Sequence, residues 1–389
     1  MKKTLAAVAV LGAFAGSALA ADVQLYGLID TGLQYLHSDA DMANMDATDR
    51  FSMESGMASG SRFGFKGTED LGNGLTVGFV LENGFTSDDG AEKGVFFDRE
   101  SSLFLQGGFG KVAFGHMGSI NNGTSSWGKY GMISAFGTSW GDYAAQAGTW
   151  AMGAGLWDNM ISYQTPTFAG FTVYAQYGMG NKVDGKNRAG VAGKYGAENE
   201  SSSNRYYALG ATYANGPLNL YFAVDSINYA SATFTEQGIN VTAMDDSLTV
   251  TLGGNFDFEV VKLFAGAQYF DEIQLSGMKG AVQLENTGFA AKMEGWSLGV
   301  SASIPAAGGT VLVGAAYLDA EAAGSVTSEA KDDELNRWIV SAGYDYPFSK
   351  RTDVYGVVTY NQDQMDSKTA TNDRDPSVYG VMVGLRHKF

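Results

Sequence analysis

Three histidines and no cysteine limit the chemistry that this 389-residue chain can carry out. These two residue types supply most protein metal ligands and many of the bases and nucleophiles of hydrolytic sites. His37, His116 and His387 are far apart in the sequence, which argues against a metal centre or a catalytic triad. Only His116 lies well inside a predicted strand, so an enzyme would need a nucleophile beside it. We therefore expect no enzymatic activity, no metal and no cofactor.

The composition excludes several classes of protein. A net charge of −17 argues against a nucleic-acid partner, because phosphate binding needs a concentrated basic surface. A hydrophobic content of 45% excludes a disordered chain, and after the first twenty residues no apolar run reaches the length of a spanning helix. Fifty-three glycines, five prolines and 13% aromatic residues instead indicate strands, tight turns and aromatic girdles.

The first twenty residues have the three parts of a secretory signal peptide. The apolar core is too short for a membrane-spanning helix, which needs about 18 residues. We expect residues 1–20 to be removed on export and residues 21–389 to form a single domain. The three parts are a positive start (Lys2, Lys3), an apolar core (Leu5 to Ala15) and a cleavage box (Ala18-Leu19-Ala20).

The remainder of the chain alternates apolar and polar residues with a period of two, which predicts β-strands with one apolar face. In the segment 23–36, for example, Leu25, Ile29 and Leu33 share one side and Gln24 and Asp30 share the other. Each such segment is close to the roughly 9 to 11 residues of a tilted membrane strand. Similar segments are 171–177, 218–228, 262–270, 296–304, 311–318, 336–346, 353–361 and 381–389.

The connections between these segments are of two kinds that alternate along the chain. Short turns rich in Gly, Asn and Pro, such as LGNG and PAAGG, alternate with long, polar and mostly acidic loops. Counting the strands between them gives about 16, an even number, as in outer-membrane barrels. The long loops are 37–58, 85–94, 119–157, 181–202, 229–246, 272–291, 319–333 and 363–375.

Backbone hydrogen bonding then requires closure of the sheet. An unpaired backbone group in hydrocarbon costs several kcal/mol, so a spanning sheet cannot keep an open edge. The last strand, which ends on Phe389, should pair with the strand that begins near Val23. A barrel of about 16 strands is too wide for its side chains to fill, so it leaves an aqueous channel. A secreted β-sandwich or adhesin would also alternate, but it would not alternate short turns with long acidic loops.

Five segments, in order along the mature chain, resemble the 16-stranded trimeric general porins of Gram-negative outer membranes. They are LYGLIDTGLQY, SRFGFKGTEDLGNGL, GGFGKVAFG, NMISYQTPTFAGF and GLRHKF. The resemblance implies a transmembrane antiparallel β-barrel with short periplasmic turns, long extracellular loops and a third loop, about 119–157, folded into the pore. It also implies a homotrimer, and recognition of Phe389 by the barrel-assembly machinery.

The resemblance places basic side chains on the wall opposite the third loop. Arg62, with Lys66 on the same strand parity, and Arg99 match such positions. His116 and Ser162 stand where similar sequences commonly carry arginine, so the basic wall appears thinned. Arg62 and Arg99 could instead form structural ion pairs at the rim.

The third loop differs from the family pattern because its acidic motif is replaced by SAFGTSWGDY. Lys129 and Asp142 are its only charged side chains, while Trp140 and Tyr143 belong to a group of aromatic residues. These rings could stack on sugars or aromatic solutes, or they could pack the loop against the wall; packing is the more common role.

The expected function is passive diffusion of ions and small hydrophilic solutes through a water-filled channel of the outer membrane. With the basic wall reduced and the long loops acidic, the sequence predicts a weak cation preference. Divalent cations could also bridge the acidic loops to lipopolysaccharide. The alternative is a substrate-selective channel that uses the aromatic loop. The predicted pore-lining set is Arg62, Lys66, Arg99, His116, Ser162, Asp142, Lys129, Trp140 and Tyr143.

Overall fold

The computed structural model describes residues 22–42, 45–137, 148–150, 155–180, 204–229, 234–236, 239–241, 245–274, 292–324, 326, 329–368 and 373–389. These residues form strands almost throughout. Within these ranges there is no helix with the length and apolar character needed to cross a membrane. The strands are β1 (Asp22–Asp39), β2 (Thr48–Ser55), β3 (Arg62–Gly72), β4 (Leu75–Gly84), β5 (Glu100–Gly107), β6 (Gly110–Gly118), β7 (Leu156–Gln164), β8 (Phe171–Gly178), β9 (Arg205–Asn215), β10 (Leu218–Asn228), β11 (Phe234–Glu236), β12 (Ile239–Val241), β13 (Leu248–Asp257), β14 (Lys262–Gln274), β15 (Lys292–Ala306), β16 (Gly309–Ala322), β17 (Glu334–Pro347), β18 (Thr352–Asp366) and β19 (Ser377–Lys388).

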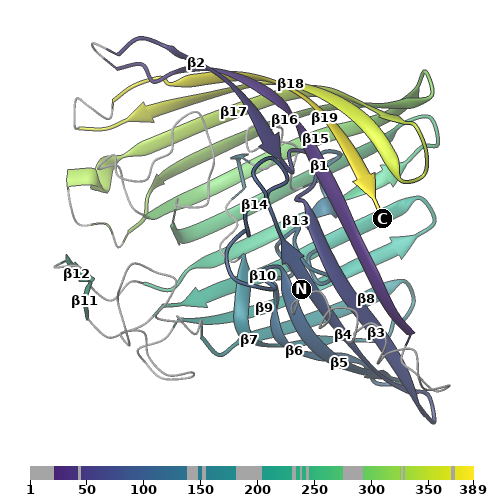
Figure 1. Ribbon diagram of the computed structural model, residues 1–389. Coiled ribbons are helices and arrows are strands. Elements are labelled where there is room, and N and C mark those ends of the chain that lie inside the picture. Colours follow the sequence, from purple (N-terminus) through teal and green to yellow (C-terminus); the bar gives the residue numbers. More distant parts are fainter. Residues whose placement is uncertain are drawn as a thin grey trace, which may run out of the picture.

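One antiparallel sheet of seventeen strands closes on itself, because β1 pairs with β19 as well as with the next strands in the chain (Figure 1). β2 and β3 both pair with the same edge of β1, β2 with Thr31–Ser38 and β3 with Asp22–Leu28. These two short strands therefore share one place in the wall, and the barrel has sixteen positions. The predicted sixteen-stranded closed barrel is confirmed. β11 and β12 form a separate hairpin.

Because apolar and polar residues alternate in the sequence, the two faces of the barrel wall differ in polarity. Apolar side chains face outward, for example Leu25 and Val383, which are 59% and 52% exposed. Polar and charged side chains face inward, where Asp30 and Arg337 are fully covered. Such an outer surface is suited to hydrocarbon, since a charge on the lipid face near the midplane costs about 2–4 kcal/mol.

The prediction that residues 37–58 form a loop was only partly right. β1 continues to Asp39, and β2 runs alongside it from Thr48 to Ser55. The periodicity is hard to see here because acidic residues interrupt the apolar set. The pairing nevertheless places Phe51 opposite Tyr35 and Met53 opposite Leu33, which keeps apolar side chains together across the two strands.

The barrel closes at its last residue. Gly27 and Phe389 exchange two backbone hydrogen bonds of 3.1 Å, so the last residue pairs with the first strand as predicted. The ring of Phe389 lies against Gly27: a Cβ added to Gly27 would be 2.2 Å from the ring and 2.8 Å from the carbonyl oxygen of Arg62. The absence of a side chain at Gly27 therefore allows this seam to form.

Replacing Gly27 by alanine is expected to reduce the yield of folded barrel several-fold, because the new methyl group collides with both the Phe389 ring and the backbone. The measurement is the folded fraction in detergent, read from the gel mobility of unheated against heated samples. Gly356→Ala in β18 is the matched control, since the nearest atom to its Cβ would be 3.8 Å away. Equal folded fractions for the two variants would contradict this account of the seam.

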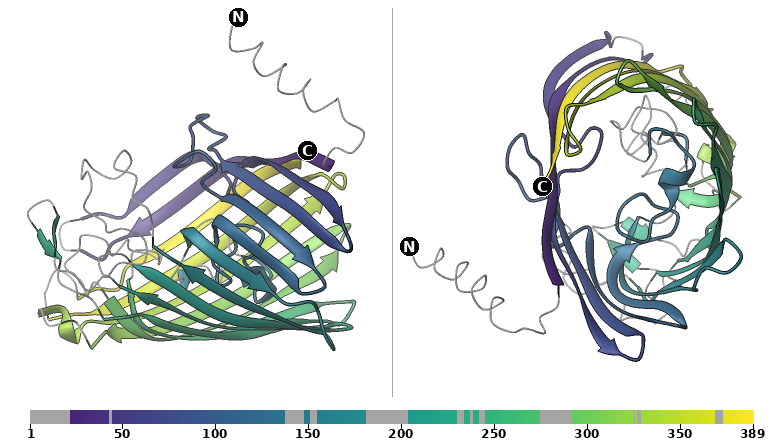
Figure 2. Two further views of the ribbon diagram at one scale, coloured as in Figure 1. Left: turned by 90° about the horizontal axis from the view of Figure 1, so that it is seen from below. Right: turned by 90° about the vertical axis from the view of Figure 1, so that its right-hand side faces the viewer.

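The third long connection, between β6 and β7, enters the barrel. Viewed along the barrel in the right panel of Figure 2, this blue segment lies inside the ring of strands. Its described residues contact strands around the wall: Ile120 N–H donates to Gln176 on β8, and Ala135 N–H to Ser301 on β15, at 2.7 and 2.9 Å. The inward third loop is thus confirmed for residues 119–137.

Candidate functional site

The main cavity of the barrel has a volume of about 1230 Å³ and lies between the third loop and the wall formed by the first strands. The described part of the loop contributes small, neutral or apolar residues to its lining. Because this side of the cavity carries no charge in the described residues, the field inside depends on the opposite wall. The loop residues that line it are Gly123, Thr124, Gly128, Gly131, Met132, Ser134, Ala135, Phe136 and Gly137.

Polar contacts hold the loop to the wall at its start and along its length. Glu100 of β5 accepts hydrogen bonds from the backbone N–H and the hydroxyl of Ser126, at 2.8 and 3.0 Å. Tyr221 of β10 donates to the carbonyl oxygen of Ile120 at 3.2 Å. Asn255 of β13 donates to the carbonyl oxygen of Met132 at 2.8 Å. These bonds attach the loop to β5, β10 and β13.

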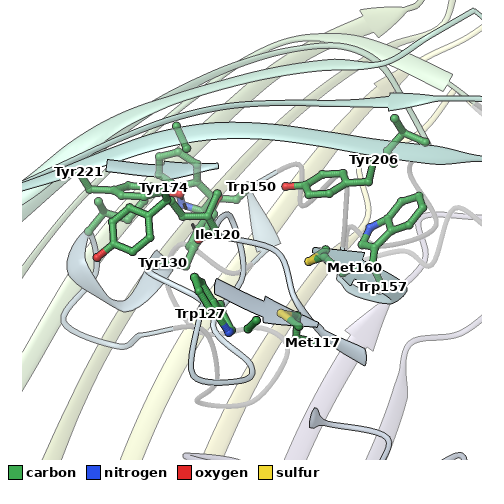
Figure 3. Packing of buried hydrophobic residues seen from close by; sticks show 14 of the residues in the cluster. Met117, Ile120, Trp127, Tyr130, Trp150, Trp157, Met160, Tyr174, Tyr206 and Tyr221 are labelled. Atoms are coloured by element: carbon green, nitrogen blue, oxygen red, sulfur yellow. Dashed lines mark hydrogen bonds between the residues drawn. The ribbon is translucent and has the colours of Figure 1, made fainter. Parts of the chain in front are cut away.

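The aromatic residues of the loop fill the space between loop and wall (Figure 3). Trp127, Trp150 and Trp157 are 2%, 0% and 4% exposed. Trp150 meets Tyr130 edge-on with ring centroids 5.5 Å apart, and Trp157 stacks on Tyr206 at 5.2 Å. Buried rings cannot stack on a passing solute, so these side chains serve to pack the loop against the barrel wall.

Two arginines share one carboxylate on the wall opposite the loop. Arg99 Nε lies 2.6 Å from Glu82 Oε1, and Arg62 Nε lies 3.5 Å from Glu82 Oε2. Tyr26 also donates to Glu82, at 3.1 Å. The register between β3 and β4 brings Arg62 close to Glu82: Arg62 stands opposite Gly84, which is two residues beyond Glu82 and on the same face of β4. The pair of guanidinium groups therefore keeps a net positive charge next to the cavity.

Further cations line the same cavity. Arg50, Lys93 and Lys262 contribute side chains, whereas Glu54 is the one carboxylate among its lining residues. Arg50 lies 3.5 Å from Glu54 and also donates to Gln34. With Arg62 and Arg99, five basic side chains face one acidic side chain. Among the residues that the structure describes, this cavity is thus lined by more basic than acidic side chains.

Lys66 and Lys129 do not line the 1230 Å³ cavity, although Lys66 shares a smaller cavity with Arg62, Glu82 and Arg99. Lys66 lines two smaller cavities of about 260 and 240 Å³, with its ammonium group 5.2 Å from the centre of the Tyr26 ring. Lys129 packs over the ring of Tyr174 at 5.3 Å. Burial lowers the pKa of Lys129, and nearby Lys111 lowers it further. Lys66 therefore extends the basic wall from the cluster towards the short turns.

The structure places His116 and Ser162 away from the cavity. In β6 the side chains of Ala113 and Met117 are buried inside while Phe114 is 51% exposed, so His116 belongs to the outward set. Its Nδ1 lies 2.6 Å from Asp158, and Nε2 lies 2.9 Å from the carbonyl oxygen of Asp98. Ser162 faces inward but is fully covered, with hydrogen bonds to Gln176 and Met117. Neither side chain lines the 1230 Å³ cavity.

Asp142, Trp140 and Tyr143 lie outside the described residues. Conversely, sequence reasoning missed Glu82, which both arginines contact, and the buried pair Arg337–Asp363. Glu82 could have been found, because a charged residue in the middle of a membrane strand has to face the lumen. The partner of Arg337 depends on register, which the sequence does not reveal.

Several acidic side chains of the long loops have local partners. Asp49, on β2, accepts one hydrogen bond from Tyr35 and lies 2.8 Å from Nδ1 of His37. Asp332 forms an ion pair with Lys368. Some charges of the acidic loops are therefore balanced by local partners that do not line the 1230 Å³ cavity.

Comparisons with known proteins agree with this architecture. A family model described as Gram-negative porin matches residues 6–366. An outer membrane porin protein of Bordetella pertussis is 35% identical over 422 residues, covering 100% of both chains. A solved structure titled as an anion-selective porin from Comamonas acidovorans is 26% identical, with a TM-score of 0.62 over 95% of this chain and 100% of that one. The trimer form of OmpT from Vibrio cholerae shares the fold at 16% identity, with a TM-score of 0.58 over 95% and 100%.

Proposed function

Because this chain belongs to the Gram-negative porin family and is an outer-membrane protein, we propose that it forms a water-filled diffusion channel with a weak preference for small anions. The observation that carries the preference is the charge of the cavity lining. Among the described residues, five basic side chains and the carboxylate of Glu54 line the 1230 Å³ cavity, Glu82 lies between two of the five, and the loop surface carries no charge. A fixed positive field in a confined aqueous path concentrates anions and repels cations.

This proposal replaces the cation preference that the sequence predicts. That prediction relied on acidic loops and on a basic wall thinned at residues 116 and 162. The loop carboxylates act at the wide rim, where salt screens charges more than about 8–10 Å away. Arg62 and Arg99 act at the narrow part, where every ion passes close to them. The relative from Comamonas acidovorans, which is an anion-selective porin, supports the same sign.

The selective aromatic channel has less support. Of the rings on which it depended, Trp127, Trp150 and Trp157 are buried, and Trp140 and Tyr143 lie outside the described residues. An enzymatic role has equally little support. The hydrogen bonds of His116 go to Asp158 and to a backbone carbonyl, not to a hydroxyl that it could activate.

We also propose that three barrels associate, as in the trimer form of the Vibrio cholerae relative. Residues 1–20 would be the removed export signal, Phe389 would be read by the barrel-assembly machinery, and divalent cations would join the acidic loops to lipopolysaccharide. In planar bilayers, three equal closing steps per insertion event would support the trimer, and independent single steps would exclude it.

Ion preference gives the direct test. In a tenfold KCl gradient across a bilayer that contains the purified protein, the reversal potential should have the sign set by chloride. It should amount to about 10–30 mV, well below the limit of about 59 mV for an ideally selective channel. A potential with the sign set by potassium would contradict the proposed preference. Saturable block of the current by a neutral sugar would instead favour the selective channel.

A further inference from the structure

The wall of the barrel is interrupted where β2 ends and β3 begins. Ile29 and Asp30 of β1 have no ladder partner on this side. The residues between the two strands, Gly56–Ser61, leave the wall, and Gly56–Gly60 line the 1230 Å³ cavity. We call them the inward segment. Met57 and Ala58 of this segment are buried, at 4% and 5% exposure.

One carboxylate organises the inward segment. Asp30 is fully covered, and its Oδ2 accepts the backbone N–H groups of Ala58 and Ser59 at 2.9 and 2.7 Å. Its Oδ1 accepts the hydroxyl of Tyr355, on β18, at 2.5 Å. Hydrogen bonds to an ionised acceptor are roughly twice as strong as those between neutral groups. Asp30 thus joins the inward segment to two strands of the wall.

The inward segment in turn contacts both sides of the constriction. On the loop side, Met57 and Ala58 belong to the same packed cluster as Phe136. On the wall side, Arg62 donates to the hydroxyl of Ser59 at 3.1 Å and to the carbonyl oxygen of Gly60 at 2.8 Å. Moving this segment would therefore shift the tip of the third loop and release one of the two arginines.

Two further features show that the wall is shaped for the inward segment. A Cβ at Gly32 of β1 would lie 2.3 Å from the carbonyl oxygen of Val383 on β19 and 2.5 Å from Cε of Met57, so this glycine makes room both for the neighbouring strand and for the methionine. Ser87 lies in the loop that follows β4. It donates its N–H to the hydroxyl of Ser55 at 2.8 Å, and its own hydroxyl donates to the carbonyl oxygen of Asp30 at 2.9 Å. The backbone of Asp30 stays hydrogen-bonded at the interruption: its carbonyl oxygen also accepts the N–H of Gly56 at 2.8 Å, and its own N–H donates to the hydroxyl of Ser61 at 3.1 Å.

We propose that Asp30 is a positioning residue for conduction: it holds the inward segment against Phe136 and Arg62, and so determines the width and the ion preference of the constriction. The inference builds on the proposed diffusion channel, but it concerns differences between variants. It would fail if the variants behaved alike, even where the parent protein conducts anions as proposed.

The alternative is that Asp30 matters only as a negative charge near the lumen, and two substitutions separate the roles. Asp30→Asn removes the charge but keeps an oxygen that can accept the N–H groups of Ala58 and Ser59, and an amide that can face Tyr355. Asp30→Ala removes the charge and every contact. A purely electrostatic role predicts the same raised anion preference in both variants, at the conductance of the parent.

A positioning role predicts that the two variants differ. Asp30→Asn should keep the parent conductance. The conductance of Asp30→Ala should be at least about 1.5-fold higher, because displacement of the inward segment by about 1 Å would loosen the constriction. Its anion preference should fall below that of Asp30→Asn, because Arg62 loses its anchor and the path widens. Tyr355→Phe, which removes one contact and no charge, should change in the same direction by less. Identical currents and reversal potentials for Asp30→Ala and Asp30→Asn would overturn the proposal.

Cysteine labelling gives a readout that does not depend on current. The chain has no cysteine, so Met57→Cys introduces a single thiol at a buried position. A negatively charged methanethiosulfonate reagent should modify it slowly alone and about tenfold faster with Asp30→Ala, since the segment then opens more often. With Asp30→Asn the rate should stay slow. If the Ala variant fails to fold, as judged by gel mobility, the same comparison with Tyr355→Phe decides: an unchanged rate there would overturn the proposal.

Discussion

Replacing both Arg62 and Arg99 by serine is expected to convert the channel from anion-preferring to cation-preferring. The two guanidinium groups share Glu82, so their removal also leaves that carboxylate without a cationic partner. Each charge about 7 Å from a passing ion in water contributes roughly 0.6 kcal/mol. Two such charges change the free energy of a monovalent ion by about 1 kcal/mol, or about fivefold in its permeability.

The measurement is the reversal potential in a KCl gradient, and its sign should invert relative to the parent. Glu82→Gln should move the potential in the opposite direction, towards stronger anion preference, because it removes the carboxylate and retains both arginines. Arg351→Ser, an exposed residue at a short turn, is the matched control and should leave the potential unchanged. A double serine variant that keeps the parent sign would place the selective charge elsewhere in the lumen.

The second large effect concerns the buried pair of Arg337 and Asp363. The Nε and Nη2 atoms of Arg337 donate to the two carboxylate oxygens of Asp363 at 2.6 and 2.8 Å, and both side chains are fully covered. Nη1 donates to the carbonyl oxygen of Gly148, in the returning part of the third loop, at 2.8 Å. The pair therefore connects β17 and β18 to the loop.

Arg337→Met should lower the free energy of unfolding by about 3–5 kcal/mol, because it leaves Asp363 charged and buried without a partner. The loop also loses its hydrogen bond at Gly148, so the open-channel current should become noisier. Urea unfolding in detergent, followed by tryptophan fluorescence, measures the first effect, and bilayer recording measures the second.

The double variant Arg337→Met with Asp363→Leu separates charge burial from loop attachment. Removing both ions should recover most of the lost stability, because an apolar pair of similar volume does not have to be desolvated. The current should remain noisy, because the bond to Gly148 is still absent. If the double variant were as unstable as Arg337→Met, the unpaired carboxylate would not explain the loss. If its current were as quiet as that of the parent, the Gly148 contact would not restrain the loop.

These two predictions differ in how far the sequence could anticipate them. Arg62 and Arg99 could be placed on the wall by resemblance and strand parity. Their common partner Glu82 lies in the segment 75–84, where an inward charge was open to inference. The pairing of Arg337 with Asp363 could not be inferred from the sequence. It depends on the register between β17 and β18, in which Arg337 stands opposite Asp363.

The closed barrel, its sixteen positions and the pairing of Phe389 with the first strand could all be predicted from the sequence. A two-residue period, alternating turn lengths and the need to pair every backbone group in hydrocarbon are properties that can be read locally along the chain. Three features could be seen only in the folded chain: the excess of basic side chains around the cavity, the burial of Trp127, Trp150 and Trp157, and the turn of Gly56–Ser61 into the lumen. Each of these depends on which side chains meet across strands and across the lumen, and such contacts between distant segments are set only when the sheet has closed.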